Sequence, residues 1–313
     1  MPQKNQPDII HRWKDNPIIT LSDLPFPASD ICNAGAVKFS GTYLLLVTIE
    51  NLSGQKSLYI ARSKDGLCFE VDEKPFMEPS EDEPYNKYEK MSVMDARITP
   101  FEGAYFVTYI AESSYGYRIG LARTDDFKSI TRIGMISSVD TKGGTIFSEK
   151  INGRYARLER PWSGGRIWIS YSDDLVYWGG SKVLISPRPG YWDANRVGDA
   201  SPPVRLKDGR WLVIYYGIKD TSSGPLFRIG ALILDPDDPA KVIARTNVPI
   251  LSPREDYERI GDIPNLIFSC GALVEQDRFL LYYGAAKSCI CLGTTTIDDI
   301  EKECAGGKGV SDG

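Results

Sequence analysis

The sequence has 313 residues, of which 42% are hydrophobic and 25% charged, as in an ordinary soluble globular protein. Its net charge of −5 provides no basic field for nucleic acid or an anionic membrane, and no apolar run approaches the ~20 residues that span a bilayer. We therefore expect neither a nucleic-acid nor a membrane partner. The N-terminal stretch lacks the apolar core of a signal peptide, which predicts a cytoplasmic location.

Histidine and cysteine are scarce, and this narrows the chemistry. His11 is the one histidine, so a Ser-His-Asp or Cys-His mechanism, or a His-ligated zinc, would depend on it. Cys289 and Cys291 form a C-x-C pair, but no neighbouring Cys or His completes a tetrahedral site. We expect no metal and no cofactor, and we expect carboxylates to carry any acid–base chemistry.

One strand pattern occurs five times along the chain. Each unit reads strand, tight turn, a strand that opens on an aromatic residue, a further strand and an acidic turn. The aromatic strands are GTYLLLVTIE (41–50), GAYFVTYIAE (103–112), GRYARLERPW (153–162), GRWLVIYYG (209–217) and DRFLLYYGA (277–285). Helical periodicity is nearly absent.

Units of roughly 50–70 residues suit four-stranded propeller blades with long loops. We therefore predict an all-β fold, a five-bladed β-propeller, with an irregular β-sandwich as the alternative. The propeller is expected to form one domain over residues 1–303, and the low-complexity tail 304–313 is expected to be disordered.

The repeat also predicts a polar ring at one mouth of the central channel. A polar residue stands ten positions before each repeat aromatic, at the head of an apolar strand; these residues are Asn33, Asp95, Thr145, Ser201 and Ser269. Since consecutive strands are antiparallel, the ends of the second strands return to the same mouth. Those ends carry Glu50, Glu112, Arg160, Tyr216 and the stretch up to Lys287, while nearby loops add Lys142, Trp162, Trp192, Asp193 and Arg196.

Carboxylates, cations and aromatic rings together suit a carbohydrate, whose hydroxyls and ring faces they bind. The cations would also hold an anionic group. The alternative is that polar strand heads simply cap a solvated channel.

Asp95 is the candidate general acid. It lies in MSVMDARITP, between Met94 and the strand ARIT. Partial removal from water would favour its protonated form, as a general acid requires. The structural alternative is an Asp that forms a turn or pairs with Arg97.

The sequence resembles glycoside hydrolase family 130, the inverting β-mannoside phosphorylases and their hydrolytic relatives. The similarity runs from NPIIT (16–20) to about Ile300 and includes NAGAVKF, the DARIT stretch, FSEKINGRYARLERP, WDANRVGDASPPV and LLYYGAA. The resemblance implies a five-bladed propeller. It also implies that Asp95 protonates the glycosidic oxygen through a sugar hydroxyl while phosphate attacks the anomeric carbon from the opposite face, without a catalytic base.

The resemblance further implies which residues bind phosphate. Phosphate is expected at Lys142, Arg160 and Arg196, with Asn33 and Tyr216 beside them. The expected substrate-binding residues are Glu50, Arg97, Glu112, Trp162, Asp193 and Lys287. Three positions depart from the family pattern: Ala96 replaces a Pro, Tyr216 replaces a phosphate-binding His, and Lys287 replaces an Asp expected on the mannose.

Three activities remain open from the sequence. The first is a phosphorylase that releases α-mannose 1-phosphate, and the retained cations favour it. The second is an inverting β-mannosidase that uses water, with Glu50 or Glu112 as the base at ~6.5–9.5 Å from the acid. The third is a non-catalytic sugar-binding propeller. The expected partners are a β-mannose-containing oligosaccharide or disaccharide and inorganic phosphate as co-substrate; homo-oligomer formation is left open.

Overall fold

The computed structural model describes residues 8–306, which form 22 strands and three α-helices. The prediction of an all-β chain is confirmed for these residues. The helices are α1 (Tyr85–Tyr88), α2 (Asp256–Arg259) and α3 (Ile297–Gly306), with 3₁₀ turns η1 (Leu21–Asp23) and η2 (Ser163–Gly165). None of the helices in residues 8–306 has the length and apolar character needed to cross a bilayer.

The largest sheet contains eight strands in two antiparallel groups. The first group is β3 (Asp30–Phe39), β4 (Thr42–Glu50), β5 (Lys56–Ser63) and β6 (Glu70–Val71). The second is β7 (Ser92–Phe101), β8 (Ala104–Ser113), β9 (Gly116–Thr124) and β10 (Thr131–Met135). One parallel residue pair, Lys56 with Ser92, joins the two groups.

Two further antiparallel sheets follow in chain order. One contains β11 (Thr141–Ile146), β12 (Tyr155–Pro161), β13 (Ile167–Ser172) and β14 (Gly179–Ile185). The next contains β15 (Arg196–Asp199), β16 (Val204–Arg205), β17 (Trp211–Thr221), β18 (Gly224–Leu234) and β19 (Val242–Arg245). Both β15 and β16 pair with β17, so a break in the inner strand separates Asp199 from Val204.

The last sheet joins the two ends of the described chain. It contains β20 (Ile267–Glu275), β21 (Arg278–Ala285) and β22 (Cys289–Thr296), and both β1 (His11–Arg12) and β2 (Ile19–Thr20) pair with β22. The N-terminal segment therefore supplies the outer edge of the C-terminal sheet.

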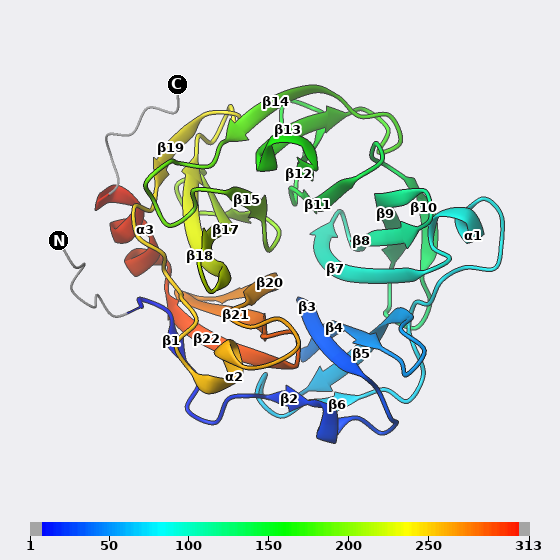
Figure 1. Ribbon diagram of the computed structural model, residues 1–313. Helices are drawn as coiled ribbons and strands as arrows, with labels where there is room; N and C mark the ends of the chain where they lie inside the picture. The colour runs from blue at the N-terminus through cyan, green and yellow to red at the C-terminus, as the bar shows by residue number, and fades with distance from the viewer. Residues whose placement is uncertain (1–7, 307–313) are drawn as a thin grey trace.

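The sheets surround a common centre, and β3, β7, β11, β15 and β20 lie nearest to it (Figure 1). Five apolar clusters fill the spaces between successive strand groups. For example, Val37 and Leu46 of the first group pack with Val93 and Val107 of the second, and Leu45 packs with Leu280 of the last sheet. This arrangement differs from the two facing layers of the β-sandwich alternative.

The C-terminal boundary lies further along the chain than the sequence indicates. Helix α3 extends through Gly306, and Cys304 is fully buried in a core cluster. Residues 304–306, which we assigned to a disordered tail, are therefore part of the folded chain. The remainder of the predicted tail lies outside the described residues.

Arg12 of β1 attaches the N-terminal segment to the interior. Its guanidinium donates hydrogen bonds to both carboxylate oxygens of Glu258 at 2.8 and 2.9 Å, to Asp8 at 2.9 Å and to the carbonyl of Ser252 at 2.6 Å. Glu258 is fully buried and also accepts a hydrogen bond from the hydroxyl of Tyr283 at 2.9 Å. The closing strand is thus held by an ion pair between the part-buried Arg12 and the fully buried Glu258.

We expect Glu258→Gln to lower the free energy of unfolding by about 2 kcal/mol, because it weakens the charge-assisted hydrogen bonds between this fully buried side chain and the part-buried guanidinium of Arg12. Urea denaturation measures the effect. The control is Lys14→Ala, which removes the exposed ion pair between Lys14 and Asp15 and should change the same free energy by less than about 0.5 kcal/mol. Equal effects of the two substitutions would contradict this role for Glu258.

Candidate active site

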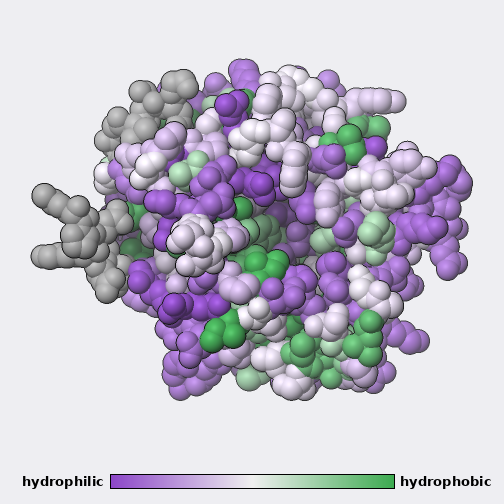
Figure 2. Space-filling view, in the orientation of Figure 1, coloured by the Kyte–Doolittle hydropathy of each residue, from purple (hydrophilic) through white to green (hydrophobic). Residues whose placement is uncertain are grey.

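A cavity of about 370 Å³ opens at the centre of the ring. Figure 2 shows this hollow near the middle of the face, mostly among hydrophilic side chains and with hydrophobic ones at its edge. Nine predicted site residues line the cavity: Asn33, Asp95, Arg97, Glu112, Lys142, Arg160, Arg196, Tyr216 and Lys287. These nine residues come from strands and turns of four sheets and meet at one cavity.

The inner strands carry β-bulges where they reach the cavity. The register shifts between Cys32 and Ala34 in β3, and between Met94 and Arg97 in β7. The bulged residues Asn33 and Asp95 have left-handed backbones, with φ of 42° and 56°. A bulge changes the face of the sheet to which a side chain points. The backbone therefore sets the direction of the Asn33 and Asp95 side chains. Asn and Asp tolerate this conformation better than most residues.

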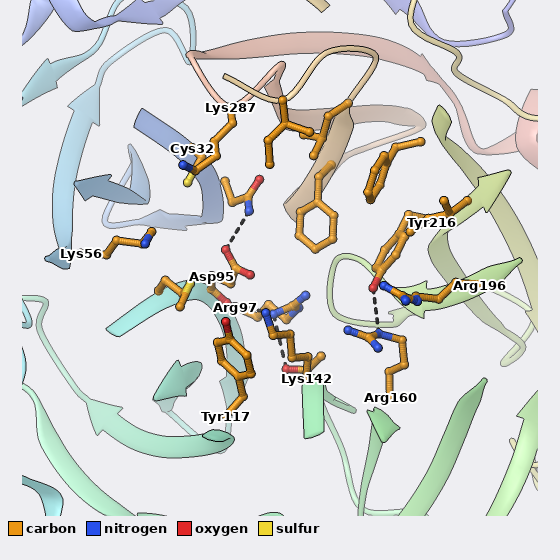
Figure 3. Close-up of a pocket in the computed structure, with 18 of the residues that line it drawn as sticks. Cys32, Lys56, Asp95, Arg97, Tyr117, Lys142, Arg160, Arg196, Tyr216 and Lys287 are labelled. Carbon is orange, nitrogen blue, oxygen red and sulfur yellow. Dashed lines mark hydrogen bonds between the residues drawn. The ribbon is translucent and has the colours of Figure 1, made fainter. Parts of the chain in front are cut away.

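Three hydrogen bonds fix Asp95. Its amide donates to Thr48 Oγ1 at 2.9 Å, and its carbonyl accepts from Arg97 Nη1 at 2.9 Å. Its carboxylate atom Oδ1 accepts from Asn33 Nδ2 at 2.7 Å (Figure 3). Both the backbone and the carboxylate are held in place before a substrate arrives.

Arg97 donates its hydrogen bonds to main-chain carbonyls. It is 1% exposed and donates to the carbonyls of Ala200 at 2.8 Å, Asp199 at 3.3 Å and Gly143 at 3.4 Å, besides that of Asp95. Its nearest carboxylate is Asp199, at 4.0 Å. Arg97 also lines the cavity, so its predicted substrate-binding role stays a prediction. The pairing with Asp95 that was the structural alternative occurs through the main chain.

Arg160 and Arg196 form a cluster with Tyr216 at one side of the cavity (Figure 3). Arg160 is buried, and its Nε donates to the hydroxyl of Tyr216 at 2.9 Å. Arg160 Nη1 is buried and has no hydrogen-bond partner among residues 8–306. The guanidinium of Arg196 lies 5.1 Å from the ring centroid of Trp162. Figure 3 shows Arg160, Arg196 and Tyr216 together across the cavity from Asp95.

Lys142 lies between this cluster and Asp95 (Figure 3). Its Nζ is 3.6 Å from the ring centroid of Tyr117, a cation–π contact. Burial lowers the pKa of Lys142, although the charge of Asp95 opposes the shift. An anionic ligand would offset this cost of burying an ammonium group.

Lys287 lies among carboxylates at the rim. Its Nζ is 2.6 Å from Asp30, 2.7 Å from Asp262 and 3.6 Å from Glu50. Burial lowers the pKa of Lys287, but its hydrogen bonds to Asp262 and Asp30 outweigh burial and raise it. Lys287 is therefore a fixed cation whose charge is already balanced. Lys287 cannot supply the carboxylate acceptor that the resemblance expects at this position.

Three predicted residues do not line the cavity. Glu50 lies behind it, 3.2 Å from Lys56. Trp162 is 59% exposed, and its ring contacts Arg196, which lines the cavity. The third, Asp193, requires a correction, because its carboxylate is fully buried and away from the mouth.

Asp193 is saturated by its neighbours. Arg188 donates to both carboxylate oxygens at 3.1 and 2.9 Å, Arg245 donates at 2.7 Å and the hydroxyl of Tyr215 donates at 2.8 Å. These bonds hold the loop before β15 against β17 and β19. Asp193 is a packing residue of this sheet.

The sequence analysis missed Lys56 and Tyr117, which also line the cavity. Lys56 pairs with Glu50 across β4 and β5, and Tyr117 pairs with Glu112 across β8 and β9. In an antiparallel sheet the third strand of each unit begins beside the end of the second strand. The positions of Glu50 and Glu112 therefore also predict those of Lys56 and Tyr117.

An apolar wall was missed as well, and the repeat carries no signal for it. Its members come from β17, β18, the loop before β20 and β20 itself: Ile218, Phe227, Ile263, Leu266 and Phe268. Tyr216 adjoins this wall, with its ring centroid 4.8 Å from that of Phe268. Such a surface suits the C–H face of a sugar ring.

Known proteins resemble this chain in sequence. Residues 47–305 match the family model of glycoside hydrolase family 130, described as beta-1,4-mannooligosaccharide phosphorylase. The 1,2-beta-oligomannan phosphorylase of Thermoanaerobacter sp. (strain X514) is 33% identical over 306 residues, covering 93% of this chain and 99% of that protein. The beta-1,2-mannobiose phosphorylase of Listeria innocua is 39% identical over 241 residues, covering 76% of this chain and 65% of that enzyme.

The solved structure of the beta-1,2-mannobiose phosphorylase from Listeria innocua, in complex with beta-1,2-mannobiose, has the same fold. The TM-score is 0.85 at 31% identity, and the alignment covers 95% of this chain and 99% of that chain. The sequence and structural matches both extend over most of the described residues. The chain belongs to glycoside hydrolase family 130.

Proposed function

We propose that the protein is an inverting β-mannoside phosphorylase, which converts a β-mannoside and inorganic phosphate to α-mannose 1-phosphate and a shortened sugar. The observation that carries this proposal is the group of cations opposite Asp95, in which Arg160 Nη1 is buried without a partner. A buried donor of this kind favours an anionic ligand. The phosphorylase names of the two relatives agree with it.

Asp95 supplies the proton in this reaction. The bond between the anomeric carbon and the glycosidic oxygen breaks, and a phosphate oxygen forms a new bond to that carbon from the opposite face. The proton of Asp95 passes to the leaving oxygen through a sugar hydroxyl, as the family resemblance implies, and solvent later restores it. Lys142, Arg160 and Arg196 would offset the desolvation of the phosphate dianion.

The cation cluster also bears on the choice between phosphate and water. A hydrolase needs a carboxylate to activate water. Glu50 lies outside the cavity lining and is paired with Lys56 and Lys287. Glu112 is thus the base to test if water is the nucleophile, because it lines the cavity. The three cations Lys142, Arg160 and Arg196 have no use in activating neutral water.

We also propose that the architecture is a five-bladed β-propeller. The support is that the eight-stranded sheet divides into two four-stranded groups joined by one residue pair, and that apolar clusters separate five successive groups. A cytoplasmic location fits the cysteines, which are free thiols, five of them buried.

Asp95→Asn should lower kcat by about 10²-fold or more while the protein stays folded, because the general acid is lost. Release of mannose 1-phosphate from an unactivated mannobiose measures this, and thermal unfolding checks the fold. Asp125→Asn, at an exposed acidic residue distant from the cavity, is the matched control and should leave kcat unchanged. Near-normal turnover of the Asp95 variant would exclude Asp95 as the acid.

Arg196→Ala should raise the KM for phosphate about ten- to hundredfold, as expected for losing one hydrogen bond to a charged group. The KM for the mannoside should change far less. Arg166→Ala removes an exposed arginine that does not line the cavity and is the control. Steady release of free mannose in phosphate-free buffer would reject phosphorolysis and direct attention to Glu112.

The lowered pKa of Lys142 predicts a pH effect on phosphate binding. An ammonium group with a lowered pKa loses its proton at a lower pH than an exposed lysine, so the KM for phosphate should rise as alkaline pH neutralises Lys142. Lys142→Arg stays charged throughout and should move this rise to higher pH. Phosphate KM values measured across neutral to alkaline pH test the difference, and identical profiles would contradict it.

A further inference from the structure

We propose that Asn33 is a positioning residue for Asp95 and not a phosphate ligand. It reserves one carboxylate oxygen as an acceptor, so that the acidic proton is carried by the other. This inference rests on the proposed function, in which Asp95 is the acid. It reassigns a residue that the family resemblance placed beside the phosphate.

The amide of Asn33 is oriented by Asp95, which lies across the cavity from Arg160 and Arg196 (Figure 3). Its Nδ2 donates to Asp95 Oδ1 at 2.7 Å. Its Oδ1 is buried without a partner among residues 8–306. That oxygen lies over Gly284, where a Cβ atom would be only 2.8 Å away. A carbonyl oxygen only accepts hydrogen bonds, so it offers no donor to the anionic oxygens of phosphate.

The same hydrogen bond determines where the acidic proton sits. An N–H group can only donate, so Asp95 Oδ1 must act as the acceptor and cannot carry a hydrogen directed at Asn33. Within the described chain, no protein hydrogen bond reaches Asp95 Oδ2. Asp95 lines the cavity, so a proton on Oδ2 can pass to a bound substrate.

The bulges make this arrangement a property of the backbone. Asn33 and Asp95 occupy equivalent bulges on the adjacent strands β3 and β7, both with positive φ. Rotating either side chain away would leave its polar atoms without the partner that the neighbouring bulge provides. The pair therefore forms one preorganised unit before substrate binds.

The other groups around Asp95 act on its charge rather than on the position of its proton. Those that interact with it electrostatically are Cys32 on β3, Arg97 on β7, Tyr117 on β9, Lys142 on β11 and Cys270 on β20. Burial raises the pKa of both thiols, and burial with a hydrogen bond to Glu112 raises the pKa of Tyr117 to about 12. These three groups therefore stay neutral near neutral pH. Lys56 and Glu112 interact electrostatically with Lys142.

Two variants of Asn33 test the proposal through the pH profile. Asn33→Gly keeps the positive φ but removes the donor. The lost hydrogen bond favours the charged carboxylate, so its removal should move the alkaline limb of kcat upward and lower kcat about tenfold at neutral pH. Asn33→Asp places two carboxyl groups in hydrogen-bond contact. Because they share one proton, the alkaline limb should move further, by at least about one pH unit.

The KM for phosphate separates the two roles of Asn33. For a positioning residue, both variants should keep this KM within about twofold of the parent protein. For a phosphate ligand, both should raise it about tenfold or more, Asn33→Asp most strongly, with the alkaline limb unmoved. That second result, or variants indistinguishable from the parent in both measurements, would overturn the proposal.

A readout without turnover separates this inference from the proposed function. Carbon-13 NMR of protein labelled at aspartate carboxyls follows the titration of Asp95, and Asp95→Asn identifies its signal. The midpoint should increase from the parent protein to Asn33→Gly and again to Asn33→Asp. This order would support the pairing even if the parent protein released mannose without phosphate, whereas an unchanged midpoint would reject the pairing even in an active phosphorylase.

Discussion

The centre of the molecule depends on the hydrogen bonds that the guanidinium of Arg97 donates to main-chain carbonyls. A buried arginine stays charged, so it needs acceptors on every side. Here they are main-chain carbonyls from β7, from β11 and from the end of β15, close to where bulges or a strand break interrupt the sheet pairing. One side chain thereby ties three sheets together at the axis. Asp199 balances part of the charge; burial raises the pKa of its carboxyl, and Arg97 opposes the rise.

The buried Arg97 and its carbonyl partners restrict the conformations of the residues around them. Gly143 has a positive φ, and a Cβ atom there would lie 1.9 Å from Asp199, so only glycine fits. Lys142 directly precedes Gly143, so the backbone conformation of Gly143 also restricts the direction of the Lys142 side chain. Asp95, whose carbonyl accepts a hydrogen bond from Arg97, is the proposed acid, and Lys142 is a proposed phosphate ligand. Their relative position thus depends on the buried hydrogen bonds of Arg97 rather than on loops at the rim.

The sequence predicted the strand heads because two simple regularities hold: side chains repeat along the five units, and antiparallel strands return to the same mouth. Those rules located Asp95, Arg160 and Tyr216 correctly. They misplaced Asp193, because the loop before β15 folds inward onto Arg188 and Arg245, and a loop carries no periodic signal. They did not predict the main-chain hydrogen bonds of Arg97, since a sequence does not show which carbonyls a bulge leaves for a guanidinium. The apolar wall was missed for a related reason, because its members come from different strands and a connecting loop.

The pairing of β1 and β2 with β22 has a consequence for synthesis on the ribosome. His11 and Arg12 pair with Thr294 and Gly293, so the final sheet needs segments from the two ends of the described chain. At about 5–20 residues per second, the N-terminal strands wait tens of seconds before their partner is made. Until then their backbone donors, and the guanidinium that later meets Glu258, remain in water. The outer edge of β22 is in turn covered as soon as that strand emerges, which protects it from pairing with another nascent chain.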